Sequence, residues 1–254
     1  MAKRMYIKDV IMFIPILNFG QFVLAHDQTA LIYTIWVNFI GFFVIIVLYT
    51  NNVCVLEACF KDINNNLVNV RETIINDEPH LLRRVYHTRK NPMLLAELRM
   101  LKKQHLEISE AVKMLNSAFG STNLAIFTFL LLDVTFNLYK YLVELNQGGR
   151  LTELFSYTLF FVLYYATYVI LIIWYVEKVK TQVRQIGSNI HRLVIHTYDK
   201  EITNELKLFS LQVLQREITF TATGFVIDAT LLTKAVCSIT TFLLILIQFL
   251  VKPC

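Results

Sequence analysis

Five stretches of the chain are apolar enough to cross a bilayer as helices. They cover residues 10–25, 30–56, 123–143, 154–176 and roughly 220–251. A hydrocarbon core of about 30 Å requires about 20 apolar residues in a helix, so the first stretch is close to the minimum. Its basic start resembles a signal peptide, but Pro15, Asn18 and Gln21 do not form a small-residue cleavage site. We therefore interpret it as a retained span.

The two long linkers, residues 57–122 and 177–219, are polar but keep a helical spacing of apolar positions. In the first linker, Asn91-Pro92 is typical of a helix start. A seam of positions spaced four and three apart follows it, made of Leu94, Leu98, Leu101, His105, Ile108, Val112, Leu115 and Phe119. The second linker has the same kind of spacing at Ile190, Val194, Ile202, Leu206, Phe209 and Val213. Such a seam packs against another helix, and His105 on it is expected to be satisfied by a neighbour and not to bind a ligand.

We also expect the seam of the first linker, with the helix of the second linker that leads into the last span, to hold copies of the chain together. A charge introduced at Leu101 or Ile108 would then be buried without a partner in the contact between copies. On this hypothesis both substitutions abolish oligomers.

Composition supports a membrane protein. Hydrophobic residues make up 56% of the 254 positions and charged residues 17%, and the mean hydropathy is +0.51. These values exclude an ordinary soluble domain. Because the chain has only seven glycines and four prolines, long helices are expected. We predict an all-α, multi-span transmembrane bundle, forming a single domain over residues 1–254, whose helices extend into a cytosolic anchor region.

Basic residues are concentrated in the two long linkers. The first carries ten lysines and arginines and the second seven, whereas the short connections carry only Arg150. Positive charge marks cytoplasmic loops, so both linkers are assigned to the cytosol. Five spans then place the N-terminus inside and the C-terminus outside. The net charge of +5 is explained by this orientation and does not indicate nucleic-acid binding.

The sequence carries no recognisable catalytic or metal-binding motif. The four cysteines form no CxxC pair, and His191 and His196 fall on different faces of a helix. Paired carboxylates, a Ser/His/Asp set and a glycine-rich phosphate loop are also absent. We therefore predict no enzyme activity, no metal and no cofactor.

A small membrane enzyme or carrier that uses Asp133, Asp228 and Lys234 is the alternative from another class. Asp133 stands in the middle of a span, where a charge must face the bundle interior. We expect it to bond to Thr135 or Asn137.

The last span carries a polar stripe. Lys234, Ser238, Thr241, Ile245 and Gln248 recur at steps of three or four, so they share one helix face. An unpaired amide in hydrocarbon costs several kcal/mol, so this face must meet protein or water. It is either a polar interface between helices or the wall of a pore.

Three blocks of sequence resemble insect gustatory receptors. They are residues 206–212, residues 220–228 with Gly224-Phe225, and Thr241-Phe242 followed by five apolar residues and Gln248-Phe249. The family signature in the third block is Thr-Tyr, five hydrophobic residues and Gln-Phe. This chain departs from it only at Phe242. Residues 115–120 also resemble the family's fifth helix.

The resemblance implies a seven-span chemosensory receptor that works as a tetrameric, ligand-gated, non-selective cation channel. On this family pattern the chain begins at the third helix, and we expect a fragment or short form. The last helix would line the pore with Thr241, Leu244, Ile245 and Gln248, with Ile245 or Leu244 as the constriction. A non-conducting fragment or a partner subunit of full-length receptors is the other open interpretation.

The implied ligand is a small tastant of unknown class. Candidate pocket residues are Tyr33, Trp36, Asp133, Asn137, Tyr157 and Tyr164. The expected location is the plasma membrane, with cations, lipid and related receptor subunits as partners in a homo- or hetero-tetramer.

Overall fold

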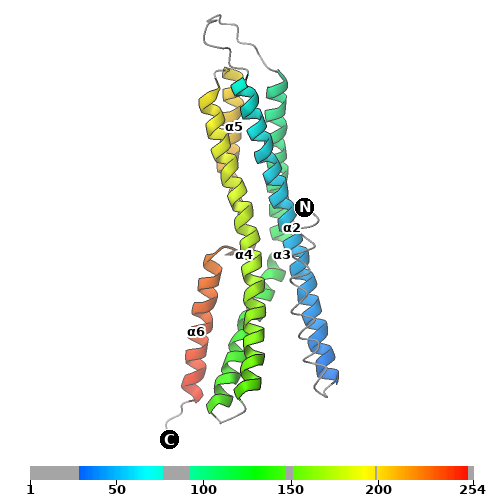
Figure 1. Cartoon of the computed structure of the whole chain (residues 1–254), viewed down its shortest axis with the longest axis vertical. Coiled ribbons are helices and arrows are strands. Elements are labelled where there is room, and N and C mark those ends of the chain that lie inside the picture. The colour runs from blue at the N-terminus through cyan, green and yellow to red at the C-terminus, as the bar shows by residue number, and fades with distance from the viewer. Residues whose placement is uncertain (1–28, 77–91, 147–150, 198, 251–254) are drawn as a thin grey trace, which may run out of the picture. The chain divides into compact units, whose positions relative to one another are not determined.

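The computed structural model describes residues 29–76, 92–146, 151–197 and 199–250. Four helices and the last span account for almost all of them. In chain order these are α2 (Thr29–Asn76), α3 (Pro92–Asn146), α4 (Leu151–His196), α5 (Lys200–Gln215) and α6 (Thr230–Leu250) (Figure 1). Two strands of two residues, β1 (Thr221–Ala222) and β2 (Phe225–Val226), pair antiparallel between α5 and α6. The all-α prediction is confirmed.

Three of the predicted spans lie within longer helices. The stretch 30–56 lies within α2, 123–143 within α3 and 154–176 within α4, and each helix continues into a predicted linker. In the described part of the chain, three helical segments are long and apolar enough to cross a membrane: Phe43–Ile75, Pro92–Asn146 and Thr230–Phe249. The predicted span at 10–25 lies outside the described residues.

The last span begins later than predicted. Helix α6 starts at Thr230, not near residue 220, because residues 221–226 form the β-hairpin. Ala222 and Ile227, which contribute to the hydropathy of this region, are fully buried in protein, whereas Phe225 and Val226 are exposed. Hydropathy does not separate protein-buried from lipid-facing residues.

The described residues fall into two compact units. Unit 2 comprises Val53–Asn116 and Glu177–Phe220, and unit 1 comprises the remainder. Unit 2 is a bundle of four helical segments, from α2, α3, α4 and α5, which Figure 1 shows side by side. Its fully buried side chains include Phe60, Ile63, Leu67, Leu98, Leu101, Ile186, Ile190, Leu193, Leu206 and Phe209. Burying each of these is worth about 1.5–3 kcal/mol, so this core is the main source of stability in unit 2.

The seam predicted from Leu94 to Phe119 is confirmed as a packing face. Leu94, Leu98, Leu101, His105, Val112 and Leu115 are buried, and Ile108 and Phe119 are half-buried. The predicted role in holding copies together is wrong for Leu101. This side chain is fully covered by the chain's own bundle, so it offers no surface to a second copy.

Polar contacts fix the pairing of the helices in unit 2. The Asn64 amide of α2 donates to the main-chain oxygen of Gln182 (2.8 Å) and to its side-chain oxygen (3.0 Å) on α4. Asn189 of α4 donates to the Asn64 side-chain oxygen at 3.0 Å. Between α3 and α5, Lys102 pairs with the buried Glu205, and Gln212 donates to the Lys102 carbonyl at 2.9 Å. A shifted register would leave these buried groups without partners, so they specify one alignment.

Unit 1 has a different surface. Large apolar side chains that protrude from it include Val44, Leu48, Phe129, Leu132, Phe136, Leu163 and Ile170. Its own core is smaller and includes Tyr49, Ile126, Leu130, Tyr168 and Ile172. Helices whose backbone groups are satisfied internally can expose apolar side chains to lipid, so these side chains of unit 1 are suited to a lipid environment.

Candidate functional site

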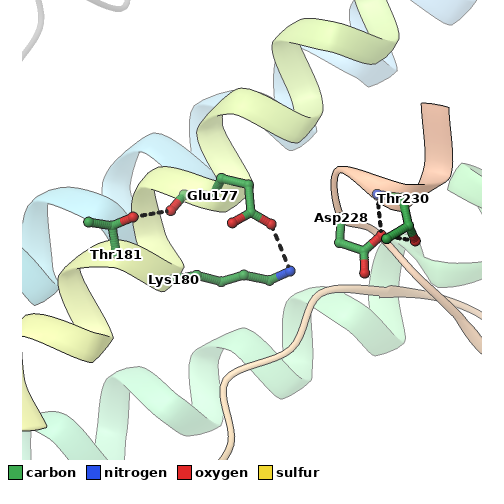
Figure 2. A network of polar contacts seen from close by, with 5 residues as sticks. All are labelled: Glu177, Lys180, Thr181, Asp228 and Thr230. Atoms are coloured by element: carbon green, nitrogen blue, oxygen red, sulfur yellow. Dashed lines mark hydrogen bonds and ion pairs between the residues drawn. The ribbon is translucent and has the colours of Figure 1, made fainter. Parts of the chain in front are cut away.

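The first turn of α6 is capped by Asp228. Its Oδ1 accepts hydrogen bonds from the Thr230 main-chain nitrogen (2.9 Å) and from the Thr230 hydroxyl (2.6 Å), as Figure 2 shows. The Leu231 nitrogen donates to the Asp228 carbonyl at 3.0 Å. A carboxylate at a helix N-terminus satisfies free N–H groups and interacts favourably with the helix dipole. Asp228 therefore has a structural function in starting α6.

A separate group of polar contacts lies on α4. Lys180 pairs with Glu177 at 3.1 Å, and the Thr181 hydroxyl donates to the Glu177 carbonyl at 2.8 Å (Figure 2). These contacts are all three or four residues apart, so they stabilise the helix locally.

The two sides of α6 differ in their cover. The partly covered side contains Leu232, Ala235, Ile239, Leu243 and Leu246, which recur at steps of three and four. The predicted pore residues Thr241, Ile245 and Gln248 are exposed, and helix geometry places them on the opposite side. Leu244, also exposed, lies beside them. No residue of the α6 apolar window is buried by the described part of the chain.

The α6 hydroxyls bond to their own helix. Thr240 donates to the Val236 carbonyl and Thr241 to the Cys237 carbonyl, each at 2.8 Å. This arrangement satisfies the donor of each threonine within the helix. The oxygen lone pairs of Thr241 are left to face outward on the exposed side. The motif residues Phe242 and Phe249 are also exposed, as are Gly224 and Phe225 in the hairpin.

Of the predicted ligand-pocket residues, Asp133 and Asn137 contact each other. Asn137 donates to the main-chain carbonyl of Asp133 at 2.8 Å, and the Thr135 hydroxyl donates to the main-chain carbonyl of Leu131 at 2.7 Å. The expected contact between Asp133 and Asn137 is thus present through the main-chain oxygen of Asp133. Tyr33 and Trp36 lie in α2, and Tyr157 and Tyr164 in α4. The side chains of these four lie outside the described part.

His105 is satisfied by neighbours on one side of its ring. It is fully buried in unit 2, edge-on to Phe60 and Phe209 at centroid distances of 5.9 and 5.7 Å. Its Nδ1 lies 3.2 Å from the Gln212 amide nitrogen. Burial, with a smaller contribution from the Arg216 charge, lowers the pKa of His105 to about 4. The ring is therefore neutral at physiological pH and Nδ1 accepts the bond from Gln212. Among the described residues no cluster has the ligands for a metal ion.

The sequence profile of the family described as 7tm chemosensory receptor matches residues 8–251. That range includes every helix of the structure and the polar stripe of α6. The chain belongs to this family. The resemblance to insect gustatory receptors drawn from the three motif blocks is thereby confirmed, and the receptor is a membrane protein.

A curated relative agrees with this assignment. The Drosophila melanogaster protein named "Putative gustatory receptor 28b" is 33% identical to the receptor over 153 residues. The aligned region covers 57% of this chain but 32% of the relative. The chain thus matches about a third of that protein's length.

Two features of the site were not predicted from the sequence. One is a row of leucines on the outer side of α5, with Leu208 53%, Leu211 51% and Leu214 80% exposed. Their spacing of three was visible within residues 206–214 as a second apolar edge beside the buried one. The other is the hairpin, for which Thr223-Gly224 between two apolar pairs was the available turn signal.

Proposed function

We propose that this chain is a subunit of a chemosensory, ligand-gated, non-selective cation channel whose pore is lined by α6. The observation that carries the proposal is the arrangement of α6. Its partly covered side is apolar except for Ser238, and Thr241 and Gln248 are on the opposite, exposed side. A side-chain amide within a bilayer requires protein or water around it, and copies of α6 facing one another across an aqueous path would supply both.

The proposed pore has a constriction and a polar mouth. Ile245, which is 45% exposed, would close the path by excluding water when several copies meet. Leu244, which is 58% exposed on the neighbouring position, is the other candidate for this ring. Gln248 lies one turn nearer the C-terminus, where amide oxygens would favour hydrated cations.

The proposed stimulus is a small-molecule tastant. A ligand opens such a channel by binding the open form more tightly than the closed form. Asp133 and Asn137 are the described members of the proposed pocket wall, and they share one face of α3.

The proposed oligomer is a tetramer of this chain, or of this chain with related receptors. Its subunits meet through the outer side of α5 and not through the α3 seam from Leu94 to Phe119. Leu208, Leu211 and Leu214 are exposed on the polar part of the chain, whereas the seam residue Leu101 is fully buried. Leu211→Glu and Leu214→Glu should each reduce the oligomer fraction measured by light scattering in mild detergent. Met100→Glu, at a residue of similar exposure on α3, is the matched control. Unchanged oligomers in both leucine variants would exclude this surface.

Cysteine accessibility tests the pore. Cys237 is exposed on α6, so it is first replaced by serine. Cysteines at 241, 245 and 248 should then react with a charged thiol reagent applied from outside, and cysteines at 243 and 247 on the partly covered side should not. The reverse pattern would place α6 against protein and lipid, with the pore elsewhere.

Ion flux tests the roles of individual pore residues. Gln248→Glu should raise divalent over monovalent permeability, because it brings several carboxylates to one mouth. Ile245→Ala should give ligand-independent flux, whereas Leu246→Ala on the covered side is the control. Flux that appears only with a co-expressed full-length relative would identify this chain as a partner subunit.

The proposed orientation has the N-terminus in the cytosol and the C-terminus outside the plasma membrane. An epitope after Cys254 should label on intact cells. An epitope between residues 80 and 90 should label only after permeabilisation. The opposite result would invert the topology.

A further inference from the structure

The hairpin between α5 and α6 is held in an unusual backbone conformation. Thr221 pairs with Val226 and Ala222 with Phe225, which leaves Thr223-Gly224 as a two-residue turn. Both turn residues have positive φ, +44° for Thr223 and +94° for Gly224. A turn of this kind favours Asn-Gly, and positive φ in a β-branched residue is a strained arrangement. Strain of this kind persists only where the surroundings hold the residue in place, and it is frequent in switch regions.

The surroundings that hold Thr223 are provided by Gly120 of α3. A Cβ atom at Gly120 would lie 3.3 Å from the main-chain nitrogen of Thr223 and 3.3 Å from its hydroxyl oxygen. It would also lie 3.8 Å from the Thr221 carbonyl oxygen. The two distances of 3.3 Å are tighter than most Cβ contacts, whereas 3.8 Å is an ordinary van der Waals distance. A side chain at position 120 would therefore require the turn to shift by a few tenths of an ångström. Two other helical glycines are not under this constraint. A Cβ at Gly41 would meet nothing within 4 Å, and one at Gly187 would meet only Val213, at 4.0 Å.

The seated hairpin is directly connected to the start of α6. Three residues separate β2 from the helix: Ile227 is fully buried, and Asp228 caps the first turn through Thr230. No slack is left in this connection, so the position of the hairpin fixes the position of the α6 N-terminus. In contrast, the rest of α6 has no buried residue in its apolar window.

We propose that the hairpin 221–226 seated on Gly120 is a latch that holds the N-terminus of α6 against α3, and that its release changes the conducting state of the channel. The backbone strain at Thr223 lowers the free energy needed to release the hairpin from Gly120, compared with an unstrained turn. The second part of this proposal rests on the proposed channel function. The first part does not.

The test compares three alanine variants of the full chain, Gly120→Ala, Gly41→Ala and Gly187→Ala, in lipid nanodiscs. Hydrogen exchange followed by mass spectrometry reports on the amides of residues 221–234. Gly120→Ala should raise their exchange rate at least about fivefold, because the added Cβ displaces the turn, and the two controls should stay within about twofold of the wild type. Unchanged exchange in Gly120→Ala, or the same increase in a control, would overturn the latch.

A double variant checks that the contact is with Thr223. Thr223→Gly removes the hydroxyl that crowds position 120 and also accepts positive φ without strain. In the Thr223→Gly background the added Cβ still meets the main-chain nitrogen of residue 223 but no longer meets the hydroxyl. Gly120→Ala should therefore raise the exchange rate by a smaller factor than in the wild-type background, which is a coupling between the two positions. Fully additive effects would show that the alanine acts elsewhere and would overturn the assignment.

Ion flux separates the latch from the channel function. In cells carrying a calcium indicator, Gly120→Ala should change ligand-independent flux at least about threefold relative to wild type and to both controls. Faster exchange with unaltered flux in a conducting receptor would overturn the coupling to gating. If the wild type conducts neither alone nor with a relative, the proposed channel function fails, and the exchange measurement still decides the latch.

Discussion

Unit 2 buries many of its apolar residues, whereas helix α6 buries none of those in its apolar window. In unit 2, Phe60, Leu101 and Leu206 are fully buried, and the buried Glu205 and Asn64 have partners within the same chain. In α6, the apolar window has no buried residue, and Thr241 and Gln248 lie away from the partly covered side. The core of unit 2 is therefore covered by the chain's own helices, and the leucines on the outer side of α5 are left for the proposed contact with a second subunit. Helix α6 instead needs lipid, water or another subunit around most of its surface. Substitutions in unit 2 should alter stability, and substitutions on the exposed side of α6 should alter function.

The largest expected effect is a charge in the bundle core. Leu101→Glu should destabilise unit 2 by about 4 kcal/mol, because it leaves a carboxylate buried without a partner. Thermal unfolding followed by circular dichroism in detergent measures this loss. Met100→Glu, the adjacent residue with 50% exposure, should alter stability by less than about 0.5 kcal/mol. Equal effects of the two variants would mean that the α3 seam is not a core face.

The next effect is a loss of stability in acid. The pKa of His105 is lowered from 6.5 to about 4 by burial, so the unfolded chain binds a proton more readily than the folded one. This contribution is fully present above pH 6.5 and is lost as the pH falls toward 4, by about 3 kcal/mol in total. The difference in stability between the wild type and His105→Leu, followed from pH 7.5 to 4.5, isolates it. A difference that does not depend on pH would contradict the buried, neutral ring.

A smaller effect is expected from the buried ion pair. Glu205→Gln should lower the free energy of unfolding by about 1–2 kcal/mol. The mostly buried ammonium of Lys102 loses its carboxylate partner, and Arg99 also loses its ion pair with Glu205. Its control is Glu107→Gln, which breaks the exposed Lys103–Glu107 pair at 3.8 Å and should cost about 0.3 kcal/mol. Chemical denaturation in detergent gives both values. A larger loss in the control would show that surface charges govern this bundle.

The smallest effect on stability, with a large effect on function, is expected in α6. Gln248→Leu and Thr241→Val should alter the unfolding of the isolated chain by less than about 0.5 kcal/mol, because both positions are exposed. Both should nevertheless reduce ion flux in cells, since they remove the polar groups of the proposed pore wall. Loss of stability without loss of flux would reverse the comparison between α6 and unit 2.

The sequence predicted the helices and their buried faces well, because the helical period of about 3.6 residues determines which residues share a face. The seam from Leu94 to Phe119 is an example, and its residues are buried or half-buried as expected. What covers the seam was not predictable, because the spacing on one helix does not identify the element that packs on it. The hairpin was missed for a related reason: Ala222 and Ile227 are as apolar as a membrane span, but they are buried in protein. The orientation of α6 toward a pore rests on the polar stripe and on exposure, and it stays a prediction.

The amide cluster of unit 2 has a consequence for biosynthesis. Asn64 bonds to Gln182, which lies 118 residues further along the chain. At a translation rate of about 5–20 residues per second, Asn64 is synthesised roughly 6–24 seconds before its partner. During that interval the packing face of α2 carries the Asn64 amide without its final partner. Any other segment that packs on this face and offers no hydrogen-bond acceptor to the amide is therefore disfavoured. Asn64 thus disfavours incorrect packing of α2 while the chain is still being synthesised. Helix α4 supplies the correct partner once Gln182 has been made.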